Sequence, residues 1–143
     1  MTQSVEQLSI FLENKIGSLN EIMDILSRAD IRIIAATVAD TTDYGILRVI
    51  TDDTQRAYEL LKASNKSCNK CEVIALSCDS SAGAFYDQLK RLTSAGVVVE
   101  YMYCFSVGTN AYLIMRVDDS AKAAEAIERN GLVTLANADL VNL

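Results

Sequence analysis

The sequence contains no histidine, no tryptophan and no proline among its 143 residues. Histidine is the side chain that enzymes use most often for proton transfer, and it supplies the imidazole ligands of metal ions. Its absence excludes many enzyme mechanisms, so we expect neither catalysis nor a cofactor. Without proline, no loop of the chain contains a residue of fixed φ.

Long apolar runs and clusters of positive charge are missing as well. No run approaches the roughly 20 apolar residues that a helix needs to cross a bilayer, and the start MTQSVEQ lacks the basic and apolar segments of a secretory signal. We therefore expect a cytoplasmic protein with no membrane partner. The net charge is −6 and the lysines and arginines are scattered. Because nucleic-acid binding needs clustered cations, nucleic acid is not an expected partner.

What the sequence does contain is an internal repeat. At a shift of 66 residues, a set of glycine, leucine, alanine and paired aspartate residues in the first half meets the same residue types in the second. The aligned residues are Gly17 and Gly83, Leu26 and Leu92, Ala29 and Ala95, Leu47 and Leu113, and Asp52-Asp53 and Asp118-Asp119. A period of this length predicts two copies of one small domain, residues 1–70 and 71–143. The join over residues 67–71 has neither proline nor glycine, which favours a tight connection.

Each copy has the same predicted order of elements. In the first, an apolar run (VEQLSIFL) precedes a helix with apolar residues at helical spacing, two strands (IRIIAATVA and YGILRVIT), a helix that begins at Asp52 or Asp53, and a weak strand over residues 66–70. The second copy repeats this order with helices over residues 82–95 and 119–130. The order βαββαβ predicts an α+β fold of two ferredoxin-like units, in which two helices cover one face of an antiparallel sheet.

Metal binding and RNA binding, two functions of this topology, are not expected for this sequence. Cys68 and Cys71 form a C-x-x-C spacing, but no second pair, histidine or helix N-terminus accompanies them, while Cys78 and Cys104 stand alone. We expect small core or edge residues and no metal. RNA recognition motifs stack bases on aromatic residues of a central strand, and the strands YGILRVI and NAYLIMRV lack that pattern.

Carboxylates occur in positions that have a structural explanation. Asp52-Asp53 and Asp118-Asp119 each open a predicted helix, where an aspartate cap stabilises by about 0.5–2 kcal/mol. We therefore expect caps and no acid/base pair. Asp40 and Asp43 in ADTTD could coordinate a cation, but a solvated hairpin turn is the favoured interpretation.

The segment ENKIGSL between the first strand and the first helix is the most informative loop. Gly17 allows a positive φ or a close approach by a ligand, and Ser18 with Glu21 has the spacing of a capping box. The first-turn N–H groups attract a carboxylate, Lys15 adds positive charge, and Asn14 can accept from an ammonium group. A ligand with both groups is a free amino acid. The alternative is that Gly17 only turns the chain and Ser18 only caps the helix.

These features resemble the tandem ACT domains, a family of amino-acid-binding regulatory modules whose first strand-to-helix loop reads approximately D/N-x-P-G-x-L. This loop matches at Asn14, Gly17 and Leu19, and the strands ADTTDYGILRVI and VEYMYCF are similar to those of a subfamily of two ACT domains without an enzyme. The resemblance implies that ACT units pair side by side and bind an amino acid at their seam. It places these residues in the site: Asn14, Lys15, Ile16, Gly17, Ser18 and Leu19 on one wall, and Met102 and Tyr103 on the other.

The sequence departs from the family pattern at three points. Ile16 replaces the usual proline, Arg32 replaces a frequent asparagine, and Ala82 replaces the proline of the second loop, DSSAGAF. The second loop is therefore the weaker candidate. We expect a non-catalytic amino-acid sensor that forms a homodimer and whose partner is an enzyme of amino-acid metabolism. The alternative is a regulatory protein-interaction subunit that has lost ligand binding.

Overall fold

The computed structural model describes residues 3–40 and 43–143, which form two compact units. The N-terminal unit is Glu6–Cys71, and the C-terminal unit contains Glu72–Leu143 together with residues 3–5. Thr41 and Thr42, the centre of the predicted ADTTD turn, lie outside the described residues.

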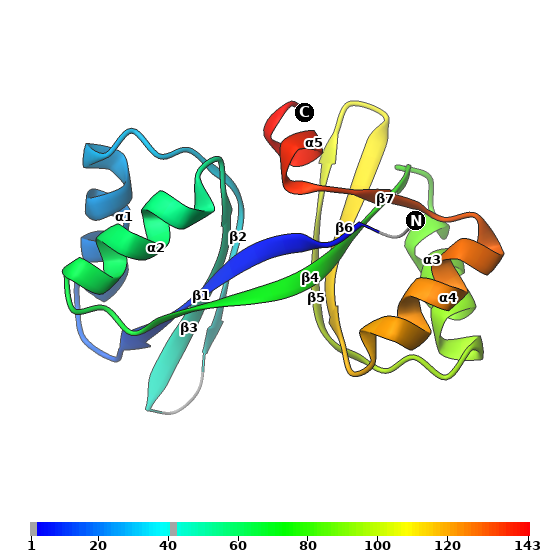
Figure 1. The fold of residues 1–143 in the computed structure, drawn as a ribbon, viewed down its shortest axis with the longest axis horizontal. Coiled ribbons are helices and arrows are strands. Elements are labelled where there is room, and N and C mark those ends of the chain that lie inside the picture. The colour runs from blue at the N-terminus through cyan, green and yellow to red at the C-terminus, as the bar shows by residue number, and fades with distance from the viewer. Residues whose placement is uncertain (1–2, 41–42) are drawn as a thin grey trace. The chain divides into compact units, whose positions relative to one another are not determined.

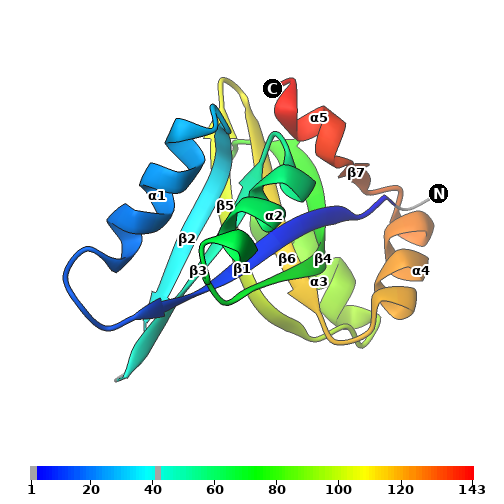
Figure 2. The same cartoon turned by 60° about the vertical axis from the view of Figure 1, so that its left-hand side comes forward.

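The N-terminal unit is one βαββαβ motif (Figure 1). Its elements are β1 (Val5–Glu13), α1 (Ser18–Arg28), β2 (Ile33–Asp40), β3 (Tyr44–Thr51), α2 (Thr54–Ala63) and the first residues of β4 (Cys68–Asp79). The strands follow the order β2-β3-β1-β4, with β3 antiparallel to both β1 and β2. Helices α1 and α2 pack on one face of this sheet (Figure 2).

The core of the N-terminal unit lies between that face and the two helices. Leu8 and Ile10 of β1 alternate with outward residues, and they meet Val49 and Leu47 of β3 as direct cross-strand partners. The helices complete the core with Ile22, Leu26, Ala57 and Leu61, all at most 1% exposed. The apolar spacing predicted for the first helix is therefore confirmed.

The C-terminal unit repeats the motif with the rest of β4, α3 (Ala84–Ser94), β5 (Val99–Val107), β6 (Asn110–Val117), α4 (Ser120–Asn130) and β7 (Val133–Leu135). Its strand order is β7-β4-β6-β5, and all three pairings are antiparallel. Leu76, Leu92 and Leu113 are fully buried in its core. The predicted fold class, two ferredoxin-like units, is confirmed.

Two features of the fold differ from the sequence-based expectation. The weak strand expected at residues 66–70 is the start of β4, a single 12-residue strand that continues to Asp79 and also serves as the first strand of the C-terminal unit. A short helix, α5 (Asn137–Val141), follows β7 and was not predicted. Leu140 anchors it at 1% exposure, and the Asp139 carboxylate accepts from the Ala136 amide at 2.8 Å.

Candidate functional site

The first loop, residues 14–17, joins the end of β1 to the start of α1. Gly17 has a φ of 90°, in the left-handed region, and a Cβ at this position would meet no atom within 4 Å. The glycine is thus required by the backbone conformation and not by crowding. The Ile16 side chain before it is fully exposed.

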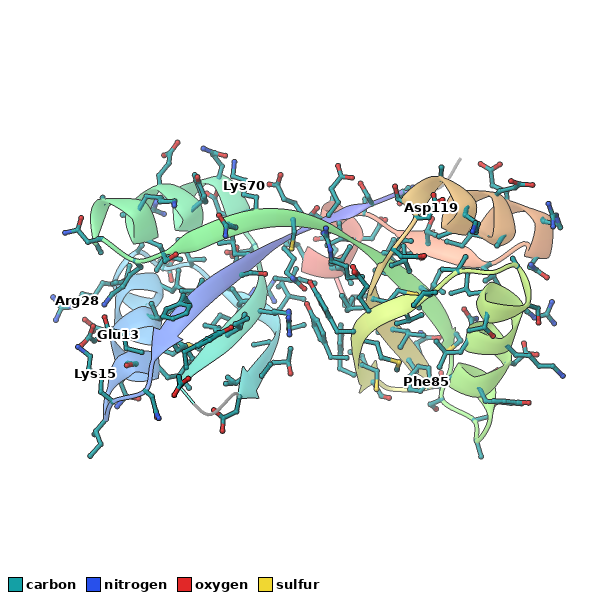
Figure 3. All side chains as sticks on the ribbon, turned by 90° about the horizontal axis from the view of Figure 1, so that it is seen from below. Glu13, Lys15, Arg28, Lys70, Phe85 and Asp119 are labelled. Carbon is teal, nitrogen blue, oxygen red and sulfur yellow. The ribbon has the colours of Figure 1, made fainter. Side chains whose placement is uncertain are left out.

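The bonds of the first loop are short-range. The backbone oxygen of Glu13, the last residue of β1, accepts from the Lys15 amide at 2.9 Å and from the Ser18 hydroxyl at 2.7 Å. The Lys15 ammonium lies 3.3 Å from the Glu13 carboxylate, and Figure 3 shows the two side chains together. The predicted capping box is wrong, because the Ser18 hydroxyl turns back to β1 and Glu21 pairs with Lys66.

Helix α1 begins without a side-chain cap. Gly17 is its N-cap residue, and the first helical bond runs from the Glu21 amide to the Gly17 oxygen at 3.0 Å. Because glycine has no side chain, the N-cap residue cannot accept from the first-turn amides of α1. Amides in this position carry partial positive charge and favour an anion.

A cleft of about 130 Å³ lies beside the first loop, entirely within the N-terminal unit. Residues from the end of β1, the first turns of α1 and the turn after α2 line it: Phe11, Leu12, Glu13, Lys15, Ser18, Glu21, Ile22, Asn65, Lys66 and Ser67. The buried side chains of Leu12 and Ile22 belong to the core, whereas the two lysines and two glutamates carry the charge of the cleft.

The Glu21 carboxylate is the best-defined ion in this cleft. The hydrogen bond and the positive charge of Lys66 lower its pKa, and the more distant Lys15 acts in the same direction. Glu21 is therefore ionised at neutral pH. Lys66 is 45 residues away in the sequence and reaches α1 because Asn65, with a φ of 60°, turns the chain after α2. No spacing rule in the sequence connects these two residues, so the pair was not predicted.

The structure brings together some of the residues predicted for this wall. Lys15 and Ser18 line the cleft, while Leu19 packs against the core of the unit. Asn14 and Ile16 are exposed on the loop. The assignment of all six residues to a ligand stays a prediction.

Met102 and Tyr103, predicted for the opposite wall, are neighbours on the edge strand β5. Met102 pairs with Met115, whose side chain lies in the core between sheet and helices, and Tyr103 pairs with Ile114 on the other face. Because successive strand residues point to opposite faces, the two side chains cannot contact one small ligand from the same side. Whether either contacts an amino acid stays a prediction.

The second loop, residues 80–83, has the same backbone turn and different side chains. Gly83 precedes α3 with a φ of 86° and no side-chain cap. The Asp79 carboxylate accepts from the Ser81 amide at 2.8 Å and from the Ser81 hydroxyl, and these two bonds lower its pKa. The second loop therefore contains an ionised carboxylate that is bound by the loop itself.

The aspartate pairs are structural, as predicted. Asp53 caps α2 by accepting from the Arg56 amide at 3.2 Å, and Asp119 caps α4 by accepting from the Lys122 amide at 3.0 Å. Their neighbours have one common role: Asp52 accepts from the Arg32 amide and Asp118 from the Val98 amide.

The C-x-x-C cysteines point away from each other. Cys68 is fully buried in the core, where burial raises its pKa to about 11. The Cys71 sulfur lies 3.2 Å from the Gln7 side-chain amide and 3.6 Å from the Ser9 hydroxyl. The described residues contain no group of three side chains that could hold a metal ion, and none of their helices is long and apolar enough to span a membrane.

Comparisons with known proteins support the same family. Protein BT0572 from Bacteroides thetaiotaomicron is similar in crystal structure, with 36% identity over 99% of each chain and a TM-score of 0.94. The regulatory subunit of aspartate kinase from Thermus thermophilus, in its ligand-free form, has 12% identity over 90% of this chain and 93% of the subunit, with a TM-score of 0.62. The Thermus flavus subunit gives 12% identity over the same shares and a TM-score of 0.61.

The Thermus structures share only the fold at this identity, and no curated protein matches the sequence. A family model described as an ACT domain pair matches residues 1–143. The family predicted from the loop motif and the repeated βαββαβ order is thus confirmed, and it is a regulatory family. The chain belongs to the ACT domain pair family.

Proposed function

We propose that this chain is a non-catalytic regulatory protein that binds a free amino acid at its first loop. The observation that carries the proposal is the start of α1. Asp53 and Asp119 cap α2 and α4 with their own carboxylates, whereas the N-cap residue of α1, Gly17, has no side chain that could do so. A ligand carboxylate can supply the missing acceptor, with the Lys15 ammonium nearby.

Both ends of an amino acid find a complementary group in this proposal. The carboxylate binds the first-turn amides, and the Asn14 side-chain oxygen or a glutamate of the cleft accepts from the ammonium group. An exposed helix N-terminus contributes only about 0.3–1 kcal/mol, and about 2 kcal/mol when it is partly buried. A second ACT unit therefore forms the opposite wall and excludes water, which requires pairing of units within the chain or in a homodimer.

The partner in this proposal is an enzyme of amino-acid metabolism. The fold is shared with regulatory subunits of aspartate kinase, which supports a partner of this kind. Binding of the amino acid changes the output only if the ligand has different affinities for two arrangements of the units. The second candidate is a protein-interaction subunit without a ligand, which the missing proline at Ile16 favours.

A thermal-shift panel of the twenty amino acids on the full chain tests the proposal. One or two amino acids should stabilise the protein, by about 2.7 kcal/mol at a concentration of 100 times Kd. The primary amide of each hit serves as a matched control, because it keeps the ammonium group and side chain but lacks the carboxylate. A flat panel, or equal stabilisation by acid and amide, contradicts the site and favours the interaction subunit.

A further inference from the structure

A second charged cavity lies in the C-terminal unit, between α3 and α4. This α3–α4 groove has a volume of about 380 Å³, within the range of small-molecule sites. Its charged and polar lining consists of Asp87, Lys90, Arg91 and Ser94 on α3 and Arg129 and Asn130 on α4. Three cations and a single carboxylate thus face one groove in a chain whose net charge is −6.

Arg91 is held in place from both sides of the groove. Its Nε donates to the Asp87 carboxylate at 3.0 Å, and its Nη1 donates to the Asn130 side-chain oxygen at 3.3 Å. The Asn130 amide group is itself fixed, because its Nδ2 donates to the Ala126 oxygen at 2.8 Å. These bonds use two of the five N–H donors of a guanidinium, so the others can donate to a ligand from a fixed position.

Helix dipoles offer a simpler explanation that accounts for only part of this arrangement. Cations near the C-terminal ends of α3 and α4 are favoured by the macrodipoles, and Arg91 and Arg129 also form i,i+4 pairs. The N-terminal unit has the same helices, and its last-turn cations, Arg28 and Lys62, stand at other positions. At the repeat shift of 66, Lys90, Arg91, Arg129 and Asn130 correspond to Asp24, Ile25, Ala63 and Ser64. The fold therefore does not require the basic groove.

We infer that the α3–α4 groove binds the phosphate group of a small phosphorylated metabolite. A phosphomonoester carries between one and two negative charges at neutral pH, which matches the excess of cations in the groove. Its three terminal oxygens can bond the Arg91 fork and the Lys90 and Arg129 groups together, whereas a carboxylate has only two oxygens. The site belongs to the C-terminal unit alone and does not depend on the amino-acid site.

Titration of the full chain with inorganic phosphate and phenyl phosphate, at constant ionic strength, tests the inference. The backbone amide signals of α3 and α4 around Arg91 and Arg129 should shift in NMR spectra, and both probes should act on the same signals. Arg91→Gln should weaken binding at least tenfold. Arg91→Lys keeps the charge but loses the forked guanidinium, so its affinity should be intermediate. It also serves as a second folded variant.

Arg28→Gln is the matched control. Arg28 forms the same i,i+4 pair with Asp24 on α1, with an Nε to carboxylate distance of 3.0 Å, and lies outside the groove. This variant loses the same charge and should bind phosphate as the unmodified chain does. Equal weakening by Arg91→Gln and Arg28→Gln, or signals that shift elsewhere, overturns the inference. Binding of an acidic peptide at the groove without any binding of the phosphate probes also overturns it, in favour of a protein partner.

Discussion

The loops that follow β1 and β4 occupy equivalent places in the two repeats, and each ends in a glycine with a φ near 90°, at 90° for Gly17 and 86° for Gly83. Both precede a helix without a side-chain cap. Lys15 of the first loop pairs with the acid at the end of β1, whereas Ser81 of the second loop donates two hydrogen bonds to Asp79. The backbone is therefore repeated and the local charge is not.

From this difference we expect the side chains around each loop, and not its backbone, to determine ligand binding. A glycine turn begins the helix in both units, but Lys15 and Lys66 offset the carboxylates of Glu13 and Glu21 beside the first loop. The ionised Asp79 beside the second loop is instead bound by Ser81. Like charges at close range oppose binding. We therefore expect the first loop to be the better acceptor for an amino acid, even though the two backbones match.

Replacing each glycine by valine breaks the comparison most strongly. At a positive φ a β-branched residue is strained by about 1–2 kcal/mol. Both variants should lose only this much stability, because neither new Cβ meets an atom within 4 Å. Gly17→Val should in addition abolish the ligand-induced stabilisation of about 2.7 kcal/mol at 100 times Kd, whereas Gly83→Val should retain it. Thermal unfolding with and without the amino acid measures both effects. Retention of the shift in Gly17→Val would move the site away from the first loop.

The helix caps provide the opposite expectation, namely equal effects in both units. Asp53→Ala and Asp119→Ala each remove a carboxylate that accepts from an amide of the first helical turn, so each should cost about 1 kcal/mol. Neither variant should change the ligand-induced shift. Urea unfolding measures the cost, with Asp24→Ala as the control because its carboxylate forms only an exposed i,i+4 pair. Unequal costs in the two units would show that the repeats are not energetically equivalent.

The repeat itself made most of the fold predictable. Leucines at helical and alternating spacing, such as Leu26 and Leu47, indicate burial from the local sequence alone. At the shift of 66, both of these leucines recur in the second copy. The 12-residue β4 was less evident because Asn69, Lys70 and Glu72 in its first half are polar and obscure a strand pattern. Short α5 depends on the burial of one residue, Leu140, which has no periodic signal.

The candidate site was predictable only where its signal was local. Gly17 was predictable because a backbone with positive φ favours glycine, which is visible in the sequence. The predicted Ser18–Glu21 capping box was wrong because both side chains bind other partners. Lys66 supplies one of those partners from the end of α2, and such a contact follows from the tertiary structure. Residue spacing located the start of the helix but could not determine which groups its side chains contact.

The smallest expected effect compares the two ionised carboxylates near the loops. Lys66 lowers the pKa of Glu21, and the hydroxyl and amide of Ser81 lower the pKa of Asp79. Lys66→Gln should therefore raise the pKa of Glu21 and leave that of Asp79 unchanged, while Ser81→Ala should do the reverse. Carboxyl chemical shifts in NMR titrations of the full chain measure both values.

The sign of the stability change follows from the lowered pKa values. A carboxylate whose pKa is lower in the folded chain stabilises the fold above its ordinary pKa, near 4.5 for Glu21, and that contribution disappears as the pH falls through the lowered value. Lys66→Gln should thus be slightly less stable at neutral pH and approach the unmodified chain in acid. The Glu21 carboxylate is exposed and Lys66 is only half-buried, so solvent screening keeps the change small. Unequal stabilities that persist at the acid end would show that Lys66 acts through packing and not through its charge.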